Sequence, residues 1–275
     1  MGELSERQQK LNGFLRARLD MNRSLGTHEV PYGGFVFAVH EQVFSPTVFS
    51  GWRYYTPLLS SRDLSGKRLL EVGCGCGITG LYLAATQKLR QLVLADINPH
   101  AVNNAKHNAK RLGLDIDIAF YQSDVFDGIP RSSFDVIYWN HPWEQEITGY
   151  RHRDELEKGL FDGGYAALAK FLKGLDEFLE PSGYAVLGFG TSADLHAFYK
   201  LCHQYGFHPY EVTDRGNYTP EYILYELRRA AAFPPLLVWK ATILRRQHVT
   251  ILKARLAHVL RNAVRLMGSS WLKRS

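Results

Sequence analysis

Short apolar runs alternate with longer amphipathic stretches between residues 67 and 227. The short runs are rich in β-branched and aromatic residues and predict strands over residues 68–72, 91–95, 116–121, 135–139, 184–189, 207–213 and 222–227. The stretches between them have helical spacing and predict helices over residues 78–87, 99–112, 165–179 and 194–205. This alternation is typical of an α/β fold with a doubly wound, mostly parallel seven-stranded sheet, which binds ligands at the carboxyl ends of its strands.

The first 60 residues have a different pattern. Apolar positions at helical spacing predict an amphipathic helix over residues 3–20. A turn at Gly33-Gly34 then leads into an apolar strand that belongs to a hairpin, and Trp52 opens another helical segment. We therefore expect three parts: an N-terminal lid or substrate segment (1–60), a ligand-binding domain (61–230) and a tail (231–275).

Composition limits the class of protein. The 275 residues suffice for a large domain with its own core. Apolar runs such as residues 233–239 are far shorter than the ~20 residues that span a bilayer, and the N-terminus has no signal-peptide core. The three cysteines predict neither a disulfide framework nor a metal site, and His196, Cys202, His203 and His208 match no known metal spacing. We expect a cytoplasmic protein without a metal.

Charge is distributed unevenly along the chain. Residues 227–275 contain eleven of the 33 Lys and Arg and no Asp or Glu, so the remaining 226 residues hold 22 basic against 27 acidic residues. Apolar residues between 252 and 267 form one stripe of a predicted amphipathic helix in this basic tail. Such a helix can pack on the sheet or in a homodimer, bind an anionic membrane surface, or bind RNA.

A strand, a tight turn and a helix meet at residues 69–80. Glu71 ends the apolar run, and Gly73, Gly75 and Gly77 follow at alternate positions around Cys74. Glycines let a ligand approach the backbone, and the helix N-terminus presents free N–H groups to it. The stretch predicts a ligand-binding turn.

This turn resembles motif I, E-x-G-x-G-x-G, of the class I S-adenosylmethionine (SAM) dependent methyltransferases. The resemblance implies a Rossmann-like methyltransferase fold with SAM as cofactor, bound by Glu71, Cys74 and the three glycines of the turn. Asp96-Ile97 ends the second predicted strand, 19 residues after Gly77, where a carboxylate can accept both ribose hydroxyls. The alternative role of Asp96 is to cap the following helix, in competition with Asn98.

Two further segments match this group of enzymes. Asp124-Val125 follows the third predicted strand, where the resemblance implies contacts to adenine, although Asp is also a common turn residue. Asn140-His141-Pro142-Trp143 follows the fourth. It resembles the N-P-P-[Y/F/W] motif of methyltransferases that modify planar nitrogens, namely the release-factor glutamine and adenine N6 branch.

More of the chain resembles the same branch: residues 105–109 match A-x-x-N-A, 123–126 match S-D-L-F, and 162–164 match D-G-L. The resemblance implies that Asn140 and the backbone after it hold the target nitrogen, while Pro142 and Trp143 shape the bend and an aromatic wall. These four residues of the turn are the predicted catalytic group.

His141 departs from the motif, which has proline there. It is either a polar group at the acceptor, which can then be an amine or imidazole as well as an amide, or a turn histidine facing water. Glu144 and Glu146 either bind a cationic substrate or belong to a polar loop.

The sequence therefore predicts transfer of a methyl group from SAM to a nitrogen of a small molecule, protein or RNA. Three alternatives stay open: a SAM cyclase of the same fold that forms azetidine-2-carboxylate and methylthioadenosine, an RNA-modifying enzyme recruited by the tail, and a non-catalytic SAM-binding module.

Overall fold

The computed structural model describes residues 6–144, 152–212 and 221–230. The chain divides into two compact units, Met1–Ala230 and Ala231–Ser275. The second unit, which contains the predicted basic helix, lies outside the described residues, as does Glu146. In the parts of the chain that the structure describes, no helix combines the length and apolarity needed to cross a bilayer.

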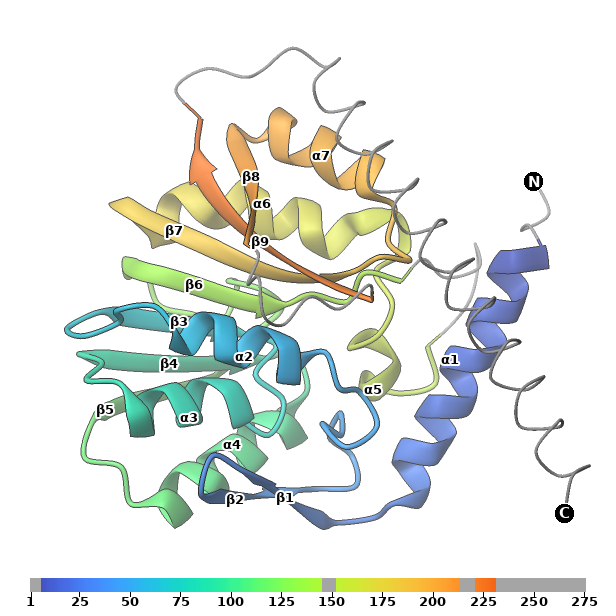
Figure 1. Cartoon of the computed structure of the whole chain (residues 1–275), viewed down its shortest axis with the longest axis horizontal. Helices are drawn as coiled ribbons and strands as arrows, with labels where there is room; N and C mark the ends of the chain where they lie inside the picture. Colours follow the sequence, from blue (N-terminus) through green and yellow to red (C-terminus); the bar gives the residue numbers. More distant parts are fainter. Residues whose placement is uncertain (1–5, 145–151, 213–220, 231–275) are drawn as a thin grey trace, which may run out of the picture. The chain divides into compact units, whose positions relative to one another are not determined.

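A seven-stranded sheet forms the centre of the first unit (Figure 1). Its strands run in the order β5-β4-β3-β6-β7-β9-β8. They are β3 (Arg68–Val72), β4 (Gln91–Asp96), β5 (Asp117–Gln122), β6 (Phe134–Asn140), β7 (Leu179–Gly190), β8 (Phe207–Val212) and β9 (Tyr222–Arg229). Five neighbouring strands are parallel, and β9 is antiparallel to both β7 and β8. The predicted doubly wound, mostly parallel sheet is confirmed.

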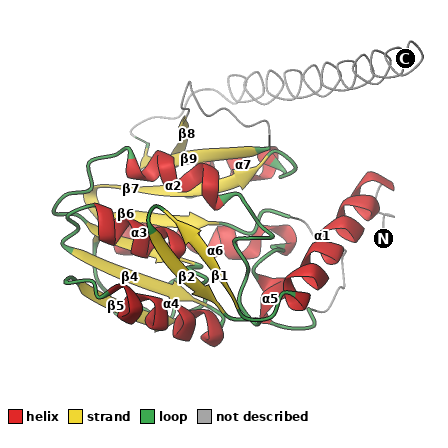
Figure 2. Ribbon diagram, turned by 60° about the horizontal axis from the view of Figure 1, so that its bottom comes forward, coloured by secondary structure: helices red, strands yellow, loops and turns green. Residues whose placement is uncertain are grey.

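Helices cover both faces of this sheet (Figures 1 and 2). On one face lie α2 (Trp52–Ser60), α3 (Ile78–Thr86) and α4 (Pro99–Leu112). On the other lie α6 (Ala166–Phe178), which follows the 3-10 turn η1 (Gly163–Tyr165), and α7 (Leu195–Gln204). Buried residues such as Leu69, Leu92 and Phe171 fill the layers between sheet and helices. The four helices predicted between the strands, now α3, α4, α6 and α7, begin and end within one residue of their predicted bounds, because caps and apolar spacing are local signals.

The N-terminal hairpin is held by α4. Its strands β1 (His28–Tyr32) and β2 (Phe35–Val39) turn at Gly33-Gly34, where both glycines have positive φ. Asn108 accepts a hydrogen bond from the Ala38 N–H and donates to the Ala38 and Cys76 carbonyls. Asn104 adds hydrogen bonds to the backbone of Ala38 and His40. These buried amides link the hairpin directly to the glycine turn.

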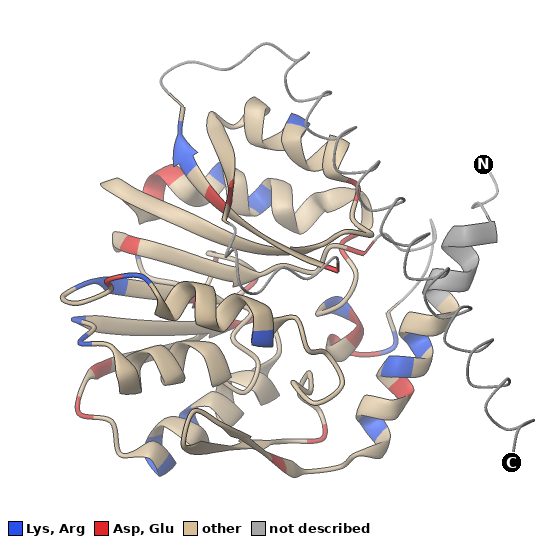
Figure 3. Ribbon diagram, in the orientation of Figure 1, with Lys and Arg blue, Asp and Glu red and all other residues tan. Residues whose placement is uncertain are grey.

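Helix α1 (Glu6–Ser24) packs against a short helix, α5 (Glu155–Lys158), that the sequence analysis did not predict. Their shared apolar cluster consists of Leu15, Leu19, Leu156, Leu160 and Phe161. The fully buried Glu157 accepts from Arg23 at 3.2 Å and from Arg153 at 2.6 Å. Figure 3 shows α1 and α5 side by side, each with acidic and basic residues. A four-residue helix has no periodicity to recognise in a sequence, so this contact emerges only in three dimensions.

Two predicted boundaries are wrong. Helix α1 ends at Ser24, four residues beyond its predicted end. The other error is the predicted start of a strand. Pro181-Ser182-Gly183 was expected to lie between a helix and a strand that starts at residue 184, but all three residues belong to β7. The pairing register between β6 and β7 shifts here, between Phe134 and Val136. Pro lacks a donor and is tolerated where ladder pairing is interrupted. A Cβ on Gly183 would meet the Phe134 carbonyl oxygen at 2.9 Å, so the close approach requires glycine.

Candidate active site

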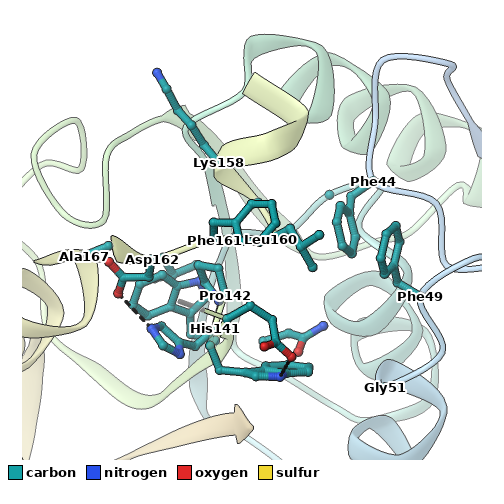
Figure 4. A pocket seen from close by; sticks show the side chains of 18 of the residues that line it. Phe44, Phe49, Gly51, His141, Pro142, Lys158, Leu160, Phe161, Asp162 and Ala167 are labelled. Atoms are coloured by element: carbon teal, nitrogen blue, oxygen red, sulfur yellow. Dashed lines mark hydrogen bonds and ion pairs between the residues drawn. The ribbon is translucent and has the colours of Figure 1, made fainter. Parts of the chain in front are cut away.

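A pocket of about 820 Å³ opens at the carboxyl ends of the parallel strands (Figure 4). The glycine turn and the residues after β4, β5 and β6 form one side of the pocket. The rest is apolar: Leu15 of α1, Leu160 and Phe161 just after α5, and the stacked pair Phe44 and Phe49 after β2, whose ring centroids lie 3.9 Å apart. Every residue predicted to bind cofactor or acceptor lines this pocket except Gly77. Strands distant in sequence thus bring the motifs together.

The three glycines of the turn all have positive φ, but their surroundings differ. A Cβ on Gly73 would lie 2.9 Å from Trp139 Nε1, and one on Gly77 would lie 2.8 Å from Leu81. A Cβ on Gly75 would enter open space within the pocket. Gly73 and Gly77 are therefore required for packing as well as for the turn, whereas Gly75 leaves room beside the backbone for a ligand.

Glu71 lies behind the turn and is buried. Its Oε2 accepts a hydrogen bond from the Gly80 N–H at 2.8 Å, one of the free donors of the first turn of α3. Burial raises the pKa of Glu71 to about 8, against the lowering effect of this hydrogen bond. The side chain thus connects the glycine turn to the helix N-terminus that faces the pocket.

Asp96 ends β4 and is half-buried in the pocket. Its Oδ2 accepts from the Gly75 N–H at 2.8 Å and its Oδ1 from the Asn98 N–H at 2.9 Å. The cap of α4 is Asn98, which accepts from the His100 N–H, so the alternative capping role for Asp96 is wrong. Burial raises the pKa of Asp96 to about 6. Its remaining lone pairs can accept hydroxyl donors.

Asp124 and Val125 lie at the rim beyond β5. Val125 has a φ of 56°, unusual for a β-branched residue, and its side chain is buried. Asp124 is exposed and pairs with Lys170 of α6 at 2.6 Å. Lys170 also pairs with Asp127. This lysine was not predicted as part of the site, because only the fold brings α6 to the loop after β5.

Asn140 ends β6 and lines the pocket. Its Oδ1 is buried and finds no hydrogen-bond partner among the described residues. An unpaired buried acceptor costs about 1–3 kcal/mol. A ligand that donates an N–H to this oxygen removes that cost.

His141 is buried rather than facing water, so the turn-histidine alternative is wrong. Its Nε2 lies 3.1 Å from Asp162 Oδ2 (Figure 4). Its ring stacks on that of Phe189, with 4.9 Å between the ring centroids. Asp162 also accepts from the N–H groups of Ala167 and Leu168 in the first turn of α6. Burial lowers the pKa of His141 although Asp162 acts in the opposite direction. The pair ties the turn after β6 to α6, a link that the proline of the motif cannot make.

Trp143 and Glu144 complete the turn. Trp143 is half-buried, and a Cβ on Gly190 would collide with its indole, so the ring packs closely against the end of β7. Glu144 is 5% exposed, and its Oε1 accepts from Trp143 Nε1 at 3.0 Å and pairs with Ser192 Oγ at 2.6 Å. Burial raises the pKa of Glu144. The polar-loop interpretation of Glu144 is wrong, because the side chain is enclosed.

The structure forms no metal-ligand cluster from His196, Cys202, His203 and His208. Within the described parts of the chain, no group of three or more His, Cys, Asp or Glu side chains could hold a metal ion. The pocket does fit SAM: Gly75 leaves space, Asp96 offers lone pairs to a ribose, and α3 points its N-terminus at the turn.

Comparisons with known proteins agree with this geometry. A family model described as methyltransferase small domain matches residues 35–170. A Methanocaldococcus jannaschii protein with the provisional name of protein N5-glutamine methyltransferase is 30% identical over 54% of this chain and 73% of its own length. The release factor glutamine methyltransferase of Shewanella oneidensis is 32% identical over 48% of this chain, which spans about half (49%) of that relative.

Solved structures agree at the level of fold. The Thermus thermophilus 16S rRNA N2 G1207 methyltransferase aligns with a TM-score of 0.52 at 17% identity over 74% of this chain and 50% of its own. A methyltransferase from Pyrococcus furiosus aligns with the same TM-score at 16% identity over 77% of this chain and 96% of its own. The family model and the sequence relatives, in agreement with the pocket, show that the chain belongs to the class I SAM-dependent methyltransferases, within the methyltransferase small-domain family.

Proposed function

We propose that this protein transfers the methyl group of SAM to a nitrogen atom that Asn140 holds at the end of β6. The observation that carries the proposal is the buried, unpartnered Oδ1 of Asn140, located in the pocket between the glycine turn and Trp143. This oxygen accepts an N–H of the acceptor and leaves the nitrogen lone pair free to attack. The sequence relatives named as glutamine methyltransferases support a nitrogen acceptor.

The protein's contribution is binding and alignment. When bound, SAM supplies a methyl group that its sulfonium already activates. Gly75 and Asp96 orient the cofactor, Asp124 and Val125 border the adenine end, and Asn140 positions the acceptor. His141, through Asp162, keeps the turn in place, and the aromatic walls exclude water. Alignment of this kind lowers the barrier without a nucleophilic residue or a metal.

The charges of the pocket favour a protein or small-molecule acceptor over RNA. Among the described residues, its lining contains seven Asp or Glu and three Lys or Arg. Two of these cations are already paired, Lys158 with Glu155 and Lys170 with Asp124. A nucleic-acid backbone is held by Lys and Arg side chains that neutralise its phosphates, and the described lining offers few unpaired cations for this.

The test is to incubate the protein with SAM and candidate acceptors, and to identify the nucleoside product by mass spectrometry. A glutamine-containing peptide, a primary amine and an RNA hairpin cover the acceptor classes. S-adenosylhomocysteine formed only with an acceptor is the expected product. Methylthioadenosine formed from SAM alone would support the cyclase, and SAM binding without turnover would support a binding module.

A further inference from the structure

Glu144 is a buried carboxyl group for which the described residues supply no cationic partner. The residue is 5% exposed and takes part in none of the ion pairs found in the described parts of the chain. Its Oε1 is engaged by Trp143 and Ser192. Both of these hydrogen bonds go to Oε1, and Oε2 accepts none from the described residues. A buried carboxylate without a cationic partner is costly unless a ligand supplies the charge.

The groups around this carboxylate suit a cation. Trp143, which donates to Glu144, lies edge-on to Tyr222 with 6.4 Å between ring centroids. Both rings line the pocket, and so does the exposed Glu221 beside them. Aromatic faces attract ammonium and guanidinium groups, and two donors on Oε1 stabilise the ionised form of Glu144. Carboxylate and rings thus form one wall of the pocket.

We propose that Glu144, with Trp143 and Tyr222, is a cation subsite that selects methyl acceptors carrying an ammonium or guanidinium group. The inference rests on the proposed function, because Glu144 follows Asn140 by four residues on the same turn. The group bound by Glu144 is distinct from the nitrogen that is methylated, because an ammonium ion has no lone pair to attack the methyl group. An acceptor of this class has at least two nitrogens, of which the uncharged one meets Asn140.

The experiment uses the full chain saturated with S-adenosylhomocysteine, so that no reaction occurs. Calorimetry compares benzylammonium with benzyl alcohol, which has the same ring and shape but no charge. We expect the wild-type protein to bind benzylammonium at least tenfold more tightly, the size of one charge-assisted contact. Glu144→Gln should abolish this preference while its affinity for S-adenosylhomocysteine stays within about twofold of wild type.

Two further variants separate the subsite from general effects. Glu155→Gln removes a pocket carboxylate that already pairs with Lys158, and the preference should persist. Ser192→Ala removes one contact to Oε1 with little change in packing, and it should reduce the preference partially. This variant also tests the proposal if Glu144→Gln does not fold.

Several results would overturn the subsite. One is that the wild type binds both probes equally or binds neither. Another is that Glu144→Gln keeps the preference for benzylammonium. A third is that Glu155→Gln loses this preference as fully as Glu144→Gln does. A tenfold loss of S-adenosylhomocysteine affinity in a folded Glu144→Gln would assign the carboxylate to the cofactor's own ammonium group. Failure of the proposed function is a separate result, because it appears as absence of turnover while the probe preference remains.

Discussion

Asp96 should make cofactor binding depend on pH between 5 and 7. Its carboxylate is half-buried, and burial raises its pKa to about 6. The ribose hydroxyls of SAM are donors, so they bind the ionised carboxylate better than the protonated one. Since a group with this pKa is roughly 10% ionised at pH 5 and roughly 90% ionised at pH 7, cofactor affinity should fall about tenfold between pH 7 and pH 5.

The stability of the ligand-free protein should change with pH in the opposite direction to its cofactor affinity. The pKa of Asp96 rises from 3.8 in the unfolded chain to about 6 in the fold, so the folded protein holds this proton more tightly. Between these two pKa values the stability of the ligand-free protein should decrease as pH rises. Above about pH 6 the protein bears the full free-energy cost of a buried, ionised Asp96. Cofactor that binds the ionised form offsets the penalty, so binding near pH 6 should release a fraction of a proton.

The assay is calorimetric titration with S-adenosylhomocysteine at pH 5, 6 and 7, in two buffers of different ionisation enthalpy at pH 6. Asp96→Asn removes the titration but retains the side-chain shape. It should bind about tenfold or more weakly at pH 7, from the loss of a charge-assisted contact, with little change at pH 5. A flat profile in the wild type, or the same slope in Asp96→Asn, would refute the assignment of Asp96 to the ribose.

Three other variants test separate parts of the structure. Asn140→Ala should lower turnover on the order of 10²-fold with unchanged cofactor affinity, because one preorganised polar group is lost; full activity would remove Asn140 from the site. Gly73→Ala should lower the melting temperature more than Gly75→Ala, since only the Cβ at position 73 meets Trp139, whereas Gly75→Ala should weaken cofactor binding more. The opposite ranking of the two variants in melting temperature and in cofactor affinity would contradict this. Leu19→Ala, at a fully buried contact of α1, should lower the free energy of unfolding by about 2–5 kcal/mol and speed hydrogen exchange in α1. Unchanged exchange would show that the contact of Leu19 does not hold α1 in place.

Local patterns predicted most of the sheet and its ligand edge. Apolar runs, caps and the glycines of the turn are properties of neighbouring residues, so the strand-turn-helix at residues 69–80 was recognisable before any contact was known. The same holds for Asp96 and Asn140, which simply follow the ends of strands. The helix ending at Leu112 was also predicted to the residue.

Long-range packing decided the environment of the same side chains. Asn108 matched a motif, but only the fold shows that it bonds the hairpin to the glycine turn, 70 and 32 residues away. His141 could have faced water or the core until Asp162 and Phe189 were placed around it. Glu144 looked like part of a polar loop until Ser192, 48 residues later, met its carboxylate. The burial and pKa of a side chain depend on which distant segments pack around it. The residues next to it in the sequence do not determine which segments these are.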